Sequence, residues 1–202
     1  MINLRGEAGK KTVMSKKIGV LALQGAFQKH LDMISKLGAE GIGIRTAYDL
    51  DSIDGLIIPG GESTVIAKLL IKNDIMNPVL ERVKSGMGLY GTCAGMILMA
   101  NRVEDSDQPL LNLMDITVKR NAYGRQKESF EASFEIKGLN DEPFSGIFIR
   151  SPMVTAYTQD IEVLAEFEGN PVLVRENKLL ASSFHPELTD DTRIHRLFLS
   201  MI

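Results

Sequence analysis

The stretch that decides the fold of this chain is Gly88–Ala100, GLYGTCAGMILMA. It begins as a short apolar run, meets a Gly-x-Cys-x-Gly turn, and continues with the apolar spacing of a helix. This pattern predicts a strand that feeds a tight turn into a helix, with the side chain of Cys93 held at the carboxyl end of the strand. Gly91 and Gly95 lack a Cβ atom, so they tolerate the strained backbone and close approach that such a turn demands.

Cys93, the single cysteine of the chain, has the surroundings of a nucleophile. The positive end of the helix macrodipole favours a negatively charged sulfur there, and the backbone N–H of Ala94 points toward negative charge that develops beside it. A lone cysteine in an apolar stretch can also be a small buried hydrophobe, but core packing gives no reason to flank one with two glycines. We therefore interpret Cys93 as a catalytic residue that needs a histidine as its base.

The composition narrows the classes of function. The 202 residues, 44% of them hydrophobic, suit one compact domain. A net charge of −3 and the lack of a long Lys/Arg run argue against nucleic acid or an anionic membrane as the main partner. No apolar stretch approaches the roughly 18 residues of a transmembrane helix. One cysteine cannot form an internal disulfide, so we expect a cytoplasmic protein.

The N-terminal segment 1–15 is polar and lacks periodicity, and it contains a second methionine, Met14. We expect residues 1–15 to be a tag, a disordered leader or the region before an alternative start. The remaining residues, 16–202, show no internal repeat and no linker long enough to separate two domains. They are expected to form a single domain.

Apolar runs alternate with helical patterns in the first half of the chain. Continuous apolar runs are typical of strands buried on both faces, and strands alternating with helices imply a parallel sheet covered by helices on both sides. Glu62 or Ser63 is placed to cap the helix that follows Pro59-Gly60-Gly61. The expected strands are 18–23, 41–45, 56–58 and the run before Cys93, and the expected helices are 26–37, 65–71 and 78–85.

The second half predicts mostly strands, several with alternating polarity, before a closing helix. The expected fold class is therefore α/β, a three-layer sandwich with a mixed, mostly parallel sheet flanked by helices and an antiparallel extension in the second half. Ligands of such sheets bind at the carboxyl ends of the strands, so the Gly60-Gly61 turn and the Cys93 turn could share one crevice. The expected strands are 112–119, 131–136, 146–150, 162–168, 171–175 and 178–184, and the helix is 191–201.

Three histidines are available to serve Cys93, and His185 is the best placed. It follows an apolar strand in His185-Pro186-Glu187, where an extended segment would point His185 and Glu187 to the same side. The carboxylate could then hold one ring nitrogen and leave the other to exchange a proton with Cys93, which makes a Cys-His-Glu triad. Taken alone, His185 could equally be a surface histidine near a loop carboxylate. His30 and His195 are expected to be solvated or capping residues.

These motifs resemble the triad-type (class I) glutamine amidotransferases. Within that class, four segments resemble the family of glutaminase subunits of pyridoxal 5′-phosphate synthase, and the resemblance runs from about Lys17 to the C-terminus. Each motif alone is moderately specific, and the four in order are highly specific. The segments are Gly19–Gly25, Gly91–Gly95, Arg120–Gln126 and Ser183–Thr189, and the class also shares Pro59–Ser63.

The resemblance implies hydrolysis of L-glutamine to L-glutamate and ammonia. Cys93 would attack the side-chain amide and form a γ-glutamyl thioester, His185 would protonate the departing ammonia, and Glu187 would orient the histidine. The backbone N–H groups of Gly61 and Ala94 would bind the oxyanion. The family uses no cofactor and no metal for this step.

The family's glutamine-binding positions map onto both glycines of the turn, an acidic residue and two arginines. Arg120 and Arg150 also suit this role on chemical grounds, because a substrate carboxylate favours a charge-assisted donor. The alternative is that both are solvated arginines at strand ends. The full set is Gly60, Gly61, Glu62, Arg120, Ile149 and Arg150.

The resemblance also implies a protein partner. The family passes ammonia to a separate (β/α)₈-barrel synthase subunit in a large hetero-oligomer, where it enters vitamin B6 biosynthesis. Gln24 and the first helix are our candidates for contact with that subunit.

Three other functions remain open at this point. A glutaminase of nucleotide or tryptophan synthesis shares the triad but not the Gly-Thr-Cys-Ala-Gly and Gly-Gly-Glu-Ser versions of the motifs. A peptidase or chaperone-like protein with an elbow cysteine would not explain His-Pro-Glu together with the arginines. A non-catalytic regulatory binder would have no need of an intact triad.

Overall fold

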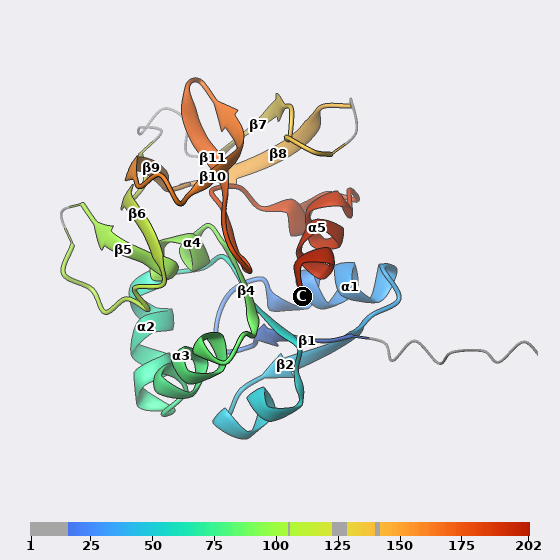
Figure 1. The fold of residues 1–202 in the computed structure, drawn as a ribbon, viewed down its shortest axis with the longest axis vertical. Helices are drawn as coiled ribbons and strands as arrows, with labels where there is room; N and C mark the ends of the chain where they lie inside the picture. Colours follow the sequence, from blue (N-terminus) through green and yellow to red (C-terminus); the bar gives the residue numbers. More distant parts are fainter. Residues whose placement is uncertain (1–15, 105, 123–128, 140–141) are drawn as a thin grey trace, which may run out of the picture.

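The computed structural model describes residues 16–104, 106–122, 129–139 and 142–202 (Figure 1). In this part of the chain, the largest sheet has seven strands in the order β10-β11-β12-β4-β3-β1-β2. Neighbouring strands from β12 to β2 run parallel, and β10 and β11 add antiparallel pairs at one edge. The strands are β1 Lys17–Leu21, β2 Glu40–Ile44, β3 Gly55–Ile58, β4 Gly88–Thr92, β10 Glu162–Phe167, β11 Asn170–Glu176 and β12 Leu179–Ser182.

Helices cover both faces of this sheet because its central strands are apolar throughout. On β3, Leu56 and Ile58 belong to one hydrophobic core and Ile57 to the other, as successive side chains of a strand point to opposite faces. One face packs against α1 Phe27–Lys36 and α5 Arg193–Met201 (Figure 1). The other packs against α2 Ser63–Lys72, α3 Met76–Lys84 and α4 Ala94–Met99. The predicted three-layer α/β fold is thus confirmed.

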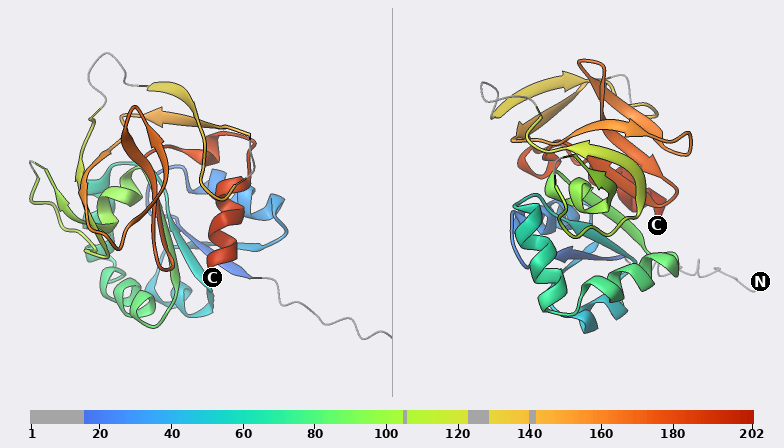
Figure 2. Two further views of the ribbon diagram at one scale, coloured as in Figure 1. Left: turned by 45° about the horizontal axis from the view of Figure 1, so that its top comes forward. Right: turned by 90° about the vertical axis from the view of Figure 1, so that its left-hand side faces the viewer.

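The later strands correct one part of that prediction, because only β10 and β11 extend the central sheet antiparallel. β12 instead pairs in parallel with β4, inside the sheet. The others form two small sheets, and Figure 2 shows the hairpin of β7 and β8, in yellow and light orange, at one end of the molecule. One contains β5 Ala100–Val103, β6 Met114–Lys119 and β9 Met153–Tyr157, and the other contains β7 Ser129–Phe134 and β8 Phe144–Ile149.

Aromatic packing explains why β7 and β8 leave the plane of the central sheet. Phe134 and Phe144 come from this hairpin, and their rings lie 5.1 and 5.4 Å from the ring of Phe184, which follows β12. All three are buried. The hairpin therefore covers the carboxyl end of β12 with an apolar surface, and the residue after Phe184 is the expected catalytic histidine, His185.

The start of α2 corrects the expected capping. Glu62 holds the N-cap position, but its side chain makes no capping hydrogen bond. Its carboxylate instead accepts from Arg120 at 2.9 Å, and the hydroxyl of Ser63 donates to Gln108 at 2.9 Å. Glu62 also accepts from the hydroxyl of Thr64 at 3.3 Å, so its carboxylate bonds to side chains rather than to the backbone N–H groups of the first turn.

Two further expectations concern the ends of the chain and membranes. The proposed tag or leader, residues 1–15, lies outside the described residues. Within the described ranges, no helix is both long and apolar enough to cross a membrane.

Candidate active site

The turn between β4 and α4 holds Cys93 in a strained conformation. Its φ is +49° and its ψ is −99°, a region that side chains rarely adopt. Its backbone N–H donates to the carbonyl of Ser182 on β12, at 2.8 Å. A Cβ atom on Gly95 would lie 2.3 Å from the carbonyl oxygen of Ile58, and one on Gly91 would lie 2.5 Å from the backbone of Gly95. Gly95 therefore lets the turn sit directly against β3, and Gly91 lets the end of β4 approach the start of α4.

His185 and Glu187 lie behind Cys93, although their backbone is not extended as expected. Pro186–Leu188 forms a short 3₁₀ helix, η2, with His185 as its N-cap residue and proline at its first position, where the ring suits the backbone. The pair still meets across this turn, with His185 Nδ1 at 2.8 Å from Glu187 Oε1. Both are buried, with 8% and 3% of their surface exposed.

The electrostatics of this pair favour a charged histidine. Burial opposes a charge on His185, but hydrogen bonds with Cys93 and Glu187 outweigh it and raise the pKa of His185 to about 10. Burial would also favour a neutral Glu187, yet His30 and His185 hold the pKa of this carboxyl below its ordinary value. At neutral pH the site therefore carries an imidazolium between a carboxylate and the sulfur of Cys93.

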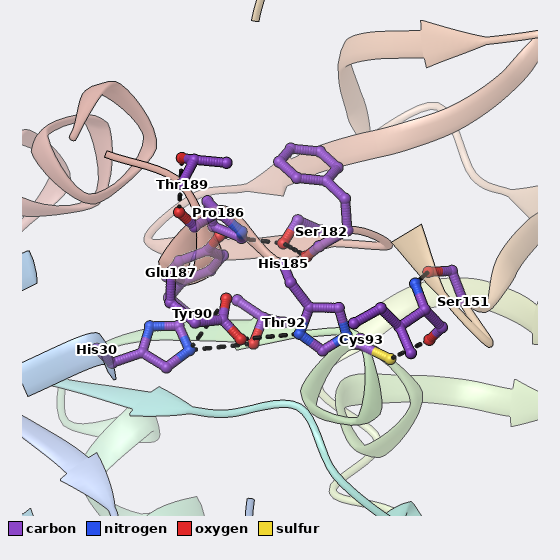
Figure 3. Close-up of polar contacts among 12 residues, drawn as sticks. His30, Tyr90, Thr92, Cys93, Ser151, Ser182, His185, Pro186, Glu187 and Thr189 are labelled. Carbon is purple, nitrogen blue, oxygen red and sulfur yellow. Dashed lines mark hydrogen bonds and ion pairs between the residues drawn. The ribbon is translucent and has the colours of Figure 1, made fainter. Parts of the chain in front are cut away.

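The other two histidines are completely buried, so the expectation of solvated or capping residues is wrong. His30 Nδ1 lies 2.9 Å from His195 Nε2, which joins α1 to α5 across one face of the sheet. Figure 3 shows Glu187 between the rings of His30 and His185, with His30 also joined to Thr92. The apolar stripe of α1, with Phe27 and Ile34 three and four residues from His30, was a sequence signal for this burial.

A cavity of about 260 Å³ opens in front of Cys93 and His185. All six predicted glutamine-binding positions line it: Gly60, Gly61, Glu62, Arg120, Ile149 and Arg150. Ala94, predicted to supply an oxyanion donor, is the first residue of α4 directly after Cys93. The sequence analysis assigned no binding role to the other lining residues, which are Gly25, Ala26, Ser63, Ile97, Asn121 and Leu188.

The turn after β3 closes one side of this cavity. A Cβ atom on Gly60 would lie 2.3 Å from the Cε1 atom of His185, so the turn packs directly on the imidazole. Gln24 fixes the next residues, since its Oε1 atom accepts from the backbone N–H of Glu62 at 2.9 Å. Gln24, predicted to contact a partner, thus also positions the turn that carries the expected oxyanion donor of Gly61.

The two arginines differ in their surroundings. Arg120 pairs with Glu62 at 2.9 Å, with 31% and 44% of the two side chains exposed. Arg150 is exposed at the end of β8, where its φ is +44°. Both arginines line the cavity, where they could bind an anionic ligand. The part of the Arg120–Gln126 motif after residue 122 lies outside the described residues. In the described part of the chain, no cluster of three or more His, Cys, Asp or Glu residues could hold a metal ion.

Both the sequence and the fold match known proteins. The family model of the SNO glutamine amidotransferase family matches residues 20–202. Pyridoxal 5′-phosphate synthase subunit PdxT of Moorella thermoacetica is 50% identical over 186 residues, which cover 92% of this chain and 99% of the relative. The subunit of the same name from Desulforudis audaxviator is 51% identical over 186 residues, with 92% and 98% covered.

A solved structure gives the same result for the fold. A crystal structure of a glutamine amidotransferase superposes with a TM-score of 0.87 at 47% identity, covering 91% of this chain and 97% of that one. The family resemblance that the motifs indicated is confirmed. This chain belongs to the SNO glutamine amidotransferase family.

Proposed function

We propose that this chain is the glutaminase subunit of a pyridoxal 5′-phosphate synthase, which hydrolyses L-glutamine to L-glutamate and ammonia. One observation carries the proposal: Cys93 and His185, the latter held from behind by Glu187, line a cavity that also presents Glu62, Arg120 and Arg150. The names of relatives about 50% identical support the assignment to this synthase.

In the first half of the reaction, the Cys93 thiolate attacks the side-chain carbonyl carbon of glutamine. The new carbon–sulfur bond places negative charge on the carbonyl oxygen, which the backbone N–H groups of Gly61 and Ala94 stabilise. One such donor is typically worth about 10²–10³ in rate. The carbon–nitrogen bond then breaks, the His185 imidazolium gives its Nε2 proton to the leaving nitrogen, and ammonia and a γ-glutamyl thioester result.

In the second half, water hydrolyses the thioester. His185, now neutral, takes a proton from the water as its oxygen attacks the thioester carbonyl. The carbon–sulfur bond breaks, glutamate leaves, and the thiolate–imidazolium pair is restored. Glu187 holds His185 Nδ1 throughout, so that Nε2 always faces the sulfur and the substrate.

The mouth of the cavity suits a zwitterionic amino acid. The guanidinium groups of Arg120 and Arg150 attract an α-carboxylate, and the carboxylate of Glu62 attracts an α-ammonium group. Because Glu62 pairs with Arg120, the two charges are held side by side at the cavity. The side-chain amide of glutamine then extends inward to Cys93.

Ammonia released to water would become ammonium, which is no nucleophile. We therefore propose that this chain docks on a separate (β/α)₈-barrel synthase subunit in a large hetero-oligomer and delivers ammonia to it. Residues 16–202 would act as one glutamine amidotransferase domain. A mechanism that depends on the free thiol of Cys93 suits the reducing cytoplasm.

The test is glutamate release from L-glutamine by the purified chain, alone and with a cognate synthase subunit. We expect release that rises strongly with the synthase and disappears in Cys93→Ala under both conditions. An inert wild-type chain in both settings, or a rate equal to that of Cys93→Ala, would instead favour a non-catalytic regulatory binder.

A further inference from the structure

The buried histidines behind the triad form a continuous polar chain with it. His195 Nε2 lies 2.9 Å from His30 Nδ1, and His30 Nε2 lies 3.5 Å from Glu187 Oε2 and 3.3 Å from the hydroxyl of Thr92. Glu187 Oε1 in turn contacts His185 Nδ1. The glutaminase mechanism described above uses only the His185 side of this carboxylate.

The protonation states along this chain follow from its geometry. Burial lowers the pKa of His195 to about 3 and also holds the pKa of His30 below its ordinary value, so both rings are neutral. A neutral imidazole has one N–H donor and one acceptor nitrogen. A carboxylate only accepts hydrogen bonds, so the His30 nitrogen that faces Glu187, Nε2, carries the proton.

That assignment fixes the next ring as well. With its proton on Nε2, His30 accepts at Nδ1, so His195 must donate from Nε2. The remaining nitrogen of His195, Nδ1, is then a bare acceptor, and it is buried without a hydrogen-bond partner in the described part of the chain. The opposite assignment would bury an N–H donor without an acceptor at that atom and would face Glu187 with a lone pair, and both cost free energy.

We propose that His30 is a positioning residue of the catalytic site, which donates from Nε2 to Glu187 Oε2 and so fixes the carboxylate that orients His185. His195 sets the tautomer of His30 by donating to its Nδ1 atom. Donors thus point in one direction along α5, α1 and η2 toward the triad. The predicted effect of His30 on glutamine hydrolysis rests on the proposed function, but its predicted effect on Glu187 and Cys93 does not.

The structure explains why the carboxylate needs this second donor. Glu187 is 3% exposed, and Oε2 has no hydrogen bond within ordinary limits among the described residues. The contact with His30 Nε2, at 3.5 Å, brings a donor nitrogen to this oxygen, and catalytic hydrogen bonds are often long in the absence of a ligand. Without His30, burial would act on an anion held by His185 alone and would raise the pKa of Glu187, and a neutral carboxyl group would no longer stabilise the imidazolium beside Cys93.

Within the described ranges, the titratable groups that face His30 come from three elements. From η2 it faces Glu187 and, further away, His185, and from α5 it faces His195. From β4 it meets Thr92 and the ring of Tyr90, whose pKa burial raises well above its ordinary value. If substitution of His30 changes the ionisation of Cys93, Glu187 is therefore the residue that transmits the effect.

Alkylation of Cys93 by iodoacetamide as a function of pH tests the proposal. Cys93 is the only cysteine, so the rate reports one thiolate, without glutamine or a synthase. We compare the wild type with His30→Leu, which has no donor, and with His30→Gln, whose amide nitrogen can replace Nε2. His30→Asn serves as a second polar variant with an amide too short to reach Glu187.

In His30→Leu and His30→Asn we expect the midpoint of alkylation to rise by about one pH unit, and kcat for glutamine to fall about tenfold with KM unchanged. His30→Gln should stay within about threefold of the wild type. Ile34→Ala, buried on the same helix, controls for lost packing and should leave the midpoint unchanged.

Superimposable alkylation profiles for the wild type and His30→Asn would overturn the proposal. So would an equal shift in Ile34→Ala, because the effect would then be structural. A wild-type chain that releases no glutamate would refute the proposed function, but the alkylation profiles would still decide the role of His30.

Discussion

Two histidines of the polar chain through Glu187, His185 and His195, are similarly buried but differ in protonation state. His185 is 8% exposed and has a pKa of about 10, whereas His195 is fully buried and has a pKa of about 3. His185 lies between a carboxylate and a thiol group, whereas among the described residues the one hydrogen-bond partner of the His195 ring is the imidazole of His30. The difference teaches that partners, rather than burial, decide which ring carries charge in this site.

The same contrast separates two regions of the molecule. In front of the triad, the charges of Glu62 and Arg120 are partly exposed at a cavity that a ligand can enter. Behind it, His30 and His195 are inaccessible and neutral. We infer that the front binds and releases substrate, while the back holds the catalytic groups in place. Substitutions in front should act on KM, and those behind should act on kcat or on stability.

The largest expected effect is a change in KM when a charged residue of the cavity is substituted. Arg120→Gln should raise KM for glutamine roughly 10–100-fold with little change in kcat, because a charge-assisted hydrogen bond is worth about 1.5–3 kcal/mol. Steady-state kinetics in the presence of the synthase measure both constants. Arg196→Gln, an exposed arginine on α5 outside the cavity, is the matched control and should leave them unchanged. A loss of kcat at constant KM in Arg120→Gln would place this side chain in the chemical step instead.

A smaller effect is expected behind the triad, on stability against acid. The folded pKa of His195, about 3, lies below the ordinary 6.5, so between pH 7 and pH 5 the unfolded chain binds a proton that the folded chain excludes. The wild type therefore loses stability on acidification, by about 2 kcal/mol from this residue. His195→Gln keeps a donor for His30 but does not titrate. Between pH 7 and pH 5, its free energy of unfolding should therefore decrease by about 2 kcal/mol less than that of the wild type. Urea unfolding at the two pH values measures this difference, and equal losses would mean that His195 is already charged in the folded protein.

The sequence was sufficient for the parallel strands of the first half and for placing Cys93 and His185 each at the end of a strand. Continuous apolar runs mark β1, β3 and β4, and the carboxyl ends of parallel strands must meet at one edge. Cys93 and His185 each follow a strand, but their proximity also requires β12 to pair in parallel with β4, whereas the pattern of the second half predicted an antiparallel extension. The catalytic role of these residues stays a prediction.

Other features depend on contacts that no local pattern contains. His30 and His195 are 165 residues apart, and an apolar stripe can indicate that a histidine is buried without indicating its partner. β5 directly follows α4 without a glycine or proline between them, so the apolar run hides the boundary. The separate β7–β8 sheet depends on aromatic packing around Phe184, which the alternating pattern of a strand does not specify.

The most direct test of the central claim is covalent labelling by a glutamine analogue whose carboxamide is replaced by a diazoketone. If Cys93 is the nucleophile of a glutamine-shaped cavity, mass spectrometry should find one label per chain, on the peptide that carries Cys93. L-glutamine should slow the labelling, and Cys93→Ala should abolish it. Labelling at another residue, or a rate that glutamine does not change, would contradict the account.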